Sequence, residues 1–220
     1  MNAGMYHGDF SAVGLFVSDG RQAVPLNTAD GRGNFFLKPN GVFVVTESGA
    51  RVLESSEYPE LRERVVLATQ SGPLLVLAGK IHPAFKPDSA SRHIRNGVGV
   101  PSPDTALFVI SEAPVSFYDF ATLFRDKLHS PDALFLDGTI SSLYAPALKR
   151  SDSRADLGPI IAVAEASAPL GQVRKSGTSH PGSPRLWRFD PGLHSGASPR
   201  LFKAQRFSKR RLKRPPWSPG

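Results

Sequence analysis

Residues 34–46 read Asn34-Phe35-Phe36-Leu37-Lys38-Pro39-Asn40-Gly41-Val42-Phe43-Val44-Val45-Thr46, two apolar runs joined by a Pro-Asn-Gly turn. Proline presets its own φ angle and Asn-Gly tolerates a positive φ, so the turn can send the chain back on itself. The second run is rich in β-branched residues, which favour strands. The stretch therefore predicts two strands joined directly by a turn, as in an antiparallel sheet.

The same pattern continues on both sides of this stretch, with Gly, Pro, Asn and Asp between the runs. The further predicted strands are Val13–Val17, Val65–Thr69, Leu74–Leu77, Ala106–Ile110, Ala133–Leu136 and Ile160–Val163. Apolar residues at helical spacing between Phe117 and Leu128, preceded by the capping residue Ser116, predict one helix. A second, shorter helix is expected over Pro59–Arg64. The fold class predicted is α+β, with a mixed, largely antiparallel sheet and few helices.

Composition supports one folded domain and excludes some chemistries. The 220 residues are 40% hydrophobic and include 14 Phe, enough for a sizeable core. Cysteine is absent, which excludes disulfides, thiolate metal sites and a Cys nucleophile. No apolar run reaches the length of a membrane span, and residues 1–5 do not read as a secretory signal. The six His residues lack paired ligand spacing, so we predict no metal and no cofactor.

Charge divides the chain into two segments. Residues 174–220 hold 12 of the 27 Lys and Arg residues but a single acid, Asp190, so the remainder is mildly acidic. Hydrophobic periodicity also stops near Ala166, and Ser, Pro, Gly and Arg dominate afterwards. We therefore predict a folded domain over 1–165 and a disordered basic tail over 166–220. Such a tail is capable of nonspecific contact with polyanions such as RNA, DNA or anionic lipid.

The strongest candidate for chemistry is the run Leu134-Phe135-Leu136-Asp137-Gly138-Thr139-Ile140-Ser141-Ser142-Leu143-Tyr144. An apolar strand leads into a carboxylate, a glycine and then two hydroxyls. Asp137 can project from the strand end, while Ser141 and Ser142 offer hydroxyl and backbone donors to an anion. Spacing alone also fits a plain strand–turn capped by the aspartate.

Three further clusters are rich in polar residues. Asn2-Ala3-Gly4-Met5-Tyr6-His7-Gly8-Asp9 supplies Asn2, a hydrogen-bonding amide, and His7, which titrates near neutrality. Gln70-Ser71-Gly72-Pro73 lies between two predicted strands. The third cluster, residues 91–100, places Arg95 just before a strand-like run, and Arg is the preferred bidentate partner of phosphate. Each cluster alone also fits a solvated loop.

Together, the four clusters and their order resemble the phosphodiester glycosidase family, in particular its bacterial branch. The resemblance lies in Asn2-Ala3-Gly4-Met5-Tyr6, Gln70–Pro73, Arg95-Asn96-Gly97-Val98-Gly99 and Leu136–Ser142. In the last motif Thr139 stands where the family has a second Gly. The resemblance covers about residues 1–164. It also implies that further strands and an export signal precede the first motif, so that this chain starts within the domain; relatives are typically periplasmic, secreted or lumenal.

The resemblance implies a hydrolase that cleaves the glycosidic bond of a sugar-1-phosphodiester. It implies catalytic roles for Asp137, as base or nucleophile, and for Arg95, as phosphate clamp. Asn2, Gln70, Gly138, Ser141, Ser142 and His7 are the implied substrate-binding residues. Two alternatives remain open: an inactive truncated relative, and a polyanion-binding protein that acts through its basic tail.

Overall fold

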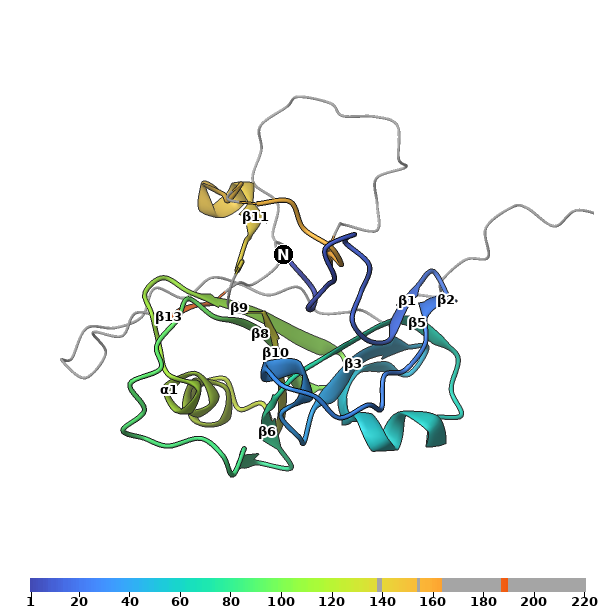
Figure 1. Ribbon diagram of the computed structural model, residues 1–220, viewed down its shortest axis with the longest axis horizontal. Coiled ribbons are helices and arrows are strands. Elements are labelled where there is room, and N and C mark those ends of the chain that lie inside the picture. The colour runs from blue at the N-terminus through green and yellow to red at the C-terminus, as the bar shows by residue number, and fades with distance from the viewer. Residues whose placement is uncertain (138–139, 154, 164–186, 190–220) are drawn as a thin grey trace, which may run out of the picture.

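The computed structural model describes residues 1–137, 140–153, 155–163 and 187–189. Two largely antiparallel sheets lie one over the other, and helices are few (Figure 1). The α+β class and the predominantly antiparallel pairing predicted from the sequence are confirmed. Within the described residues, no helix is long and apolar enough to cross a membrane.

The first sheet has five strands in the order β2-β1-β5-β3-β4, and all its pairings are antiparallel. Its strands are β1 (Phe16–Ser18), β2 (Arg21–Val24), β3 (Gly41–Thr46), β4 (Gly49–Glu54) and β5 (Val65–Ser71). The Pro-Asn-Gly turn leads directly into β3, which pairs with both β4 and β5.

The second sheet has six strands in the order β13-β9-β8-β10-β6-β7. Its strands are β6 (Leu74–Leu77), β7 (Lys80–Ile81), β8 (Asn96–Ser102), β9 (Thr105–Ser111), β10 (Asp132–Asp137) and β13 (Trp187–Phe189). Only β13, which pairs with β9, runs parallel to its neighbour. A separate two-stranded ribbon joins β11 (Tyr144–Ala145) to β12 (Arg150–Ser151).

The helical elements are short. They are α1 (Phe117–Thr122), the π-helical turn η3 (Leu123–Lys127) that continues it, and the 3-10 turns η1 (Asn34–Phe36), η2 (Ser55–Glu60) and η4 (Pro146–Leu148). The hydroxyl of Ser116 accepts a hydrogen bond from the Asp119 N–H at 3.0 Å, which satisfies one free donor at the start of α1. The predicted helix between Phe117 and Leu128 is therefore present.

Strand alternation divides the core into layers. Along β10, Leu134 and Leu136 face the first sheet, whereas Ala133 and Phe135 face α1. Phe43 and Phe108 meet edge to face, 5.6 Å apart, in the layer between the sheets. The outer layer packs Phe120 and Phe124 of the helical segment onto the second sheet.

Three predicted elements differ from the structure. Residues 34–36 form η1 rather than a strand, because Phe35 turns into the core and its carbonyl accepts a hydrogen bond from Asn40 Nδ2 at 2.9 Å. The 3-10 turn η2 ends near the residues where the helix over Pro59–Arg64 was expected, and Pro59 lies inside it. Ile160 forms only an isolated bridge, with Asn2.

The predicted disordered tail, 166–220, lies outside the described residues except for β13. That strand adds a parallel edge to the second sheet beside β9 (Figure 1). This edge of the second sheet is therefore formed by a segment that is distant in sequence from β9.

Candidate active site

Strand β10 ends at Asp137, beside the first residue of β8. The register shifts between Phe135 and Asp137, and Asp137 pairs with Asn96. The Asp137 N–H donates a hydrogen bond of 2.7 Å to Asn96 Oδ1, so a side chain holds the strand end at this irregularity. Asp137 is 7% exposed. The predicted carboxylate thus lies in a nearly enclosed position at the end of a central strand.

Asn2 reaches the same place from the beginning of the chain. Its Oδ1 accepts hydrogen bonds from Asn96 Nδ2 at 2.6 Å and from the Ser142 N–H at 3.0 Å. Its Nδ2 is buried and has no hydrogen-bond partner among the described residues. Buried polar groups without partners are uncommon and call for an explanation.

The orientation of both asparagine amides follows from their neighbours. The backbone N–H groups of Asp137 and Ser142 are donors only, so each must face an amide oxygen. Asn96 Nδ2 is then left to donate to Asn2 Oδ1. Turning Asn2 around would oppose donor to donor, so its unpaired atom is a donor.

The two serines after β10 form a turn against the same groups. Ser141 Oγ lies 2.8 Å from the carbonyl oxygen of Asp137 and 3.2 Å from that of Ile94. Ser142 Oγ is buried without a partner among the described residues. Ser142 therefore places a second unpaired polar atom beside Asn2.

Residues in and beside the β11–β12 ribbon hold this turn through hydrogen bonds. Asp152 Oδ2 accepts a hydrogen bond from the Leu143 N–H at 2.9 Å and one from Arg150 Nε at 2.8 Å. Arg150 also pairs with Glu112 at 2.6 Å. These contacts fix the residue next to Ser142.

Arg95 immediately precedes β8 and is 1% exposed. Its Nε donates to the Val115 carbonyl at 2.9 Å, and its Nη2 donates to the Ser91 carbonyl at 3.2 Å. The guanidinium carbon lies 3.6 Å from the centre of the Phe117 ring, close enough for a cation–π contact. None of the ion pairs among the described residues involves Arg95.

Burial lowers the pKa of Arg95 to about 10. The guanidinium is therefore still cationic at neutral pH. A buried cation without a carboxylate partner favours a bound anion energetically.

Tyr6 was not among the predicted site residues, yet it lies close to Asp137. Burial first, then the negative charges of Asp137 and Asp156, raise the pKa of the Tyr6 phenol. Its hydroxyl donates to the Asp156 carbonyl at 2.8 Å. Asn96 was also not among the predicted site residues, although it lies in the motif Arg95-Asn96-Gly97-Val98-Gly99.

The remaining predicted residues are placed differently. Gln70, on β5, uses its Oε1 to accept from the Leu15 and Asn27 N–H groups and its Nε2 to donate to the Asn27 carbonyl and Ser55 Oγ. These contacts account for its whole amide without a ligand. His7 is exposed on a loop. Gly138 lies outside the described residues.

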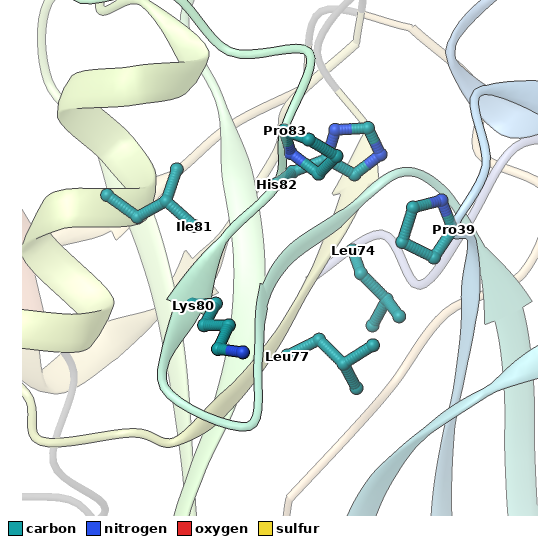
Figure 2. A pocket seen from close by; sticks show the side chains of 7 residues that line it. All are labelled: Pro39, Leu74, Leu77, Lys80, Ile81, His82 and Pro83. Carbon is teal, nitrogen blue, oxygen red and sulfur yellow. The ribbon is translucent and has the colours of Figure 1, made fainter.

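A cavity of about 180 Å³ lies elsewhere, beside β6 and β7 (Figure 2). Its lining is mainly apolar: Pro39, Leu74, Leu77, Lys80, Ile81, His82 and Pro83. Burial lowers the pKa of His82, and its Nδ1 accepts a hydrogen bond from the Ala84 N–H at 3.2 Å. The cavity shares no residue with the Asp137 cluster, so we place the candidate site at the cluster.

The arrangement at Asp137 unites several chemical functions. A carboxylate, a phenol and two polar atoms without partners among the described residues come together from segments far apart in the sequence. The buried cation Arg95 precedes β8, and its guanidinium packs on Phe117 and the Val115 carbonyl. No group of three or more His, Cys, Asp or Glu side chains in the described part of the chain is arranged to hold a metal ion. The residues present suit a polar, anionic ligand.

Comparisons with known proteins identify relatives. The pattern of the phosphodiester glycosidase family matches residues 1–164. The uncharacterized protein YigE of Escherichia coli (strain K12) is 41% identical over 144 residues, which cover 66% of this chain and 56% of YigE.

A solved structure is also similar. It is the catalytic domain of zebrafish N-acetylglucosamine-1-phosphodiester alpha-N-acetylglucosaminidase, auto-inhibited by its pro-peptide. It is 17% identical, with a TM-score of 0.44, and the match covers 62% of this chain and 49% of that chain. The chain thus spans about half the length of these relatives. The match over residues 1–164 shows that this chain belongs to the phosphodiester glycosidase family.

Proposed function

We propose that this chain hydrolyses a sugar-1-phosphodiester by cleaving the bond between the anomeric carbon and the phosphate oxygen. Family membership supports the reaction class. The observation that carries the proposal is the meeting of Asn2, Asp137 and Ser142 at one strand end. The buried cation Arg95 directly precedes Asn96, which bonds to both Asp137 and Asn2. A carboxylate for the sugar carbon and a cation for the phosphate are the two groups this reaction needs most.

The leaving group sets the demands on the site. It is a phosphate monoester with a second pKa of about 6, so it departs with little help from a general acid. The harder tasks are to stabilise positive charge at the anomeric carbon and to neutralise the phosphate. If the carboxylate acts as the base, water supplies its hydroxyl to the sugar carbon and its proton passes to the carboxylate.

Each residue then has a defined role. Asp137 acts as the base for water or as the nucleophile, two options that differ in the stereochemistry of the product. Arg95 binds the phosphate through its guanidinium, which backbone carbonyls hold in place at Nε and Nη2. Asn2 Nδ2 and Ser142 Oγ contact the substrate's oxygens, which would explain why both atoms lack partners among the described residues.

Asp137→Asn tests the central role. The amide keeps the size of the side chain but removes the charge and basicity, so turnover should fall on the order of a thousandfold. The measurement is kcat/KM against a nitrophenyl phosphodiester and a sugar-1-phosphodiester.

Asp132→Asn is the matched control. Asp132 begins the same strand, at the end away from the site, and its Oδ1 accepts a hydrogen bond from the Ala78 N–H at 2.8 Å. Its variant should keep wild-type turnover. Unchanged turnover in Asp137→Asn would exclude the carboxylate from the mechanism, and a folded wild-type protein inactive on both substrates would favour the inactive-relative alternative.

A further inference from the structure

We propose that Asn96 is a positioning residue, which holds Asp137 and Asn2 in one fixed arrangement; this inference rests on the proposed function. Asn96 is completely buried at the start of β8. Its side chain lies between the strand end that carries the carboxylate and the segment that carries Asn2. Its side chain is shielded from solvent. Among the described residues, its amide bonds to Asn2 and to the Asp137 N–H and to no charged side chain.

The amide of Asn96 works as a two-ended link. Oδ1 accepts from the Asp137 N–H at 2.7 Å, and Nδ2 donates to Asn2 Oδ1 at 2.6 Å. Asn2 Oδ1 in turn accepts from the Ser142 N–H at 3.0 Å. Asn96 therefore joins the end of β10 to Asn2 directly, and Asn2 extends the connection to Ser142.

Only an asparagine-like group fits this link. One end must accept, because it faces a backbone N–H, and the other must donate, because Asn2 Oδ1 already faces the Ser142 N–H. A residue without both functions breaks at least one connection. The register shift at Asp137 makes the link necessary, since the strand end is irregular there.

Loss of the link should impair turnover more than binding. Catalytic groups misplaced by about 1 Å cost on the order of 100-fold in rate. Asn96→Ala should therefore lower kcat by roughly 10- to 100-fold, while KM stays within about threefold of wild type because the groups that bind substrate are still present.

Asn40→Ala provides a matched control. Asn40 is another buried asparagine, 4% exposed, which directly precedes β3 and whose Nδ2 donates to the carbonyl of Phe35 in η1 at 2.9 Å. Its truncation removes a comparable buried amide and hydrogen bond outside the site. Asn40→Ala should leave kcat unchanged.

Amide hydrogen exchange tests the link without any substrate. In Asn96→Ala, the amide protons of Asp137 and Ser142 should exchange faster, on the order of tenfold or more. In Asn96→Asp, an oxygen still accepts from Asp137, so that amide should stay protected while the Ser142 amide exchanges faster. The measurement is residue-resolved exchange by NMR on the full chain.

Hydrogen exchange tests the positioning role of Asn96 and turnover tests the proposed function, so each hypothesis can fail by itself. Wild-type exchange rates at Asp137 and Ser142 in both Asn96 variants would overturn the positioning role. So would wild-type kcat in folded Asn96→Ala, or an equal loss of kcat in Asn40→Ala. A wild-type protein without turnover would overturn the proposed function, whereas exchange would still decide whether Asn96 holds these backbone groups.

Discussion

The guanidinium of Arg95 is enclosed by aromatic rings and backbone carbonyls. None of the ion pairs among the described residues involves it. The Phe117 ring centre is 3.6 Å and the Phe135 ring centre 5.6 Å from its central carbon. Enclosing a cation in this way costs free energy when no anion compensates it. In a phosphate-binding site, the negative charge of the bound phosphate would offset this free energy.

Arg95→Met should separate activity from stability. Methionine fills similar space and can contact the aromatic rings, and the Val115 carbonyl still accepts from the His93 N–H at 3.1 Å. The free energy of unfolding should therefore stay within about 1 kcal/mol of wild type, or rise. Turnover of a sugar-1-phosphodiester should fall by about 100-fold or more.

Urea denaturation and kcat/KM measure the two effects. Arg62→Met, at an arginine whose side chain is 80% exposed, is the control and should change neither quantity. Full activity in Arg95→Met would remove Arg95 from phosphate binding.

Tyr6 reports on the charge of Asp137. Burial, followed by the charges of Asp137 and Asp156, raises the pKa of Tyr6. Asp137→Asn should therefore lower the pKa of Tyr6, as followed by tyrosinate absorbance in an alkaline titration. Tyr6→Phe identifies its signal among the four tyrosines. An unmoved titration in Asp137→Asn would contradict their proximity.

The same pKa shift has a consequence for stability. The native state keeps the Tyr6 proton to higher pH than the unfolded chain does. The free energy of unfolding should thus decline as pH rises above about 10, where the unfolded phenol ionises first.

At the scale of elements, the pairing of β8 with β10 places the site and the packing of α1 supports it. Gly97 and Gly99 on β8 face the helical layer. A Cβ at Gly99 would lie 2.5 Å from Phe124 Cδ1 and 2.6 Å from Ser130 Oγ. The absence of side chains there lets the helical segment lie directly on the sheet.

Gly99→Val should destabilise the fold by about 1–3 kcal/mol through overpacking, although valine otherwise favours strands. Gly8→Val is the control, because a Cβ at Gly8 would meet nothing within 4 Å. Urea denaturation measures both. Wild-type stability in Gly99→Val would show that the helical layer can move away.

Elements with strong local patterns were predictable from the sequence, and those set by tertiary contacts were not. The apolar spacing from Phe117 to Leu128 predicts a helix, and the β-branched run of β3 predicts a strand. Residues 34–37 look equally strand-like, but the buried side chain of Phe35 and its contact with Asn40 bend the chain into η1.

The same division applies to the site. Asp137, Asn2 and Ser142 stand out as polar residues among glycines, and they meet in the structure. Asn96 does not stand out, because its role depends on strand register and on the irregularity at the end of β10. Local sequence carries neither piece of information.

At the scale of the whole molecule, the site is assembled from segments distributed over most of the domain. Asn2 pairs with Ile160, and the Ala3 N–H donates to the Pro159 carbonyl at 2.8 Å (Figure 1). Binding at this site should therefore stabilise the whole fold rather than one loop.

A phosphate monoester added at about 100 times its Kd should raise the free energy of unfolding by about 2.7 kcal/mol, as measured by the urea midpoint at constant slope. The increase should vanish in Arg95→Met. An equal increase in both proteins would place the anion at another site.

The bridge between Asn2 and Ile160 also has a consequence for biosynthesis. The ribosome makes Asn2 long before Ile160, so Asn2 has no bridge partner during most of translation. Contacts between such distant residues also slow folding, since a long loop must close before they form. We therefore expect the candidate site to take shape late in the folding of the newly made protein.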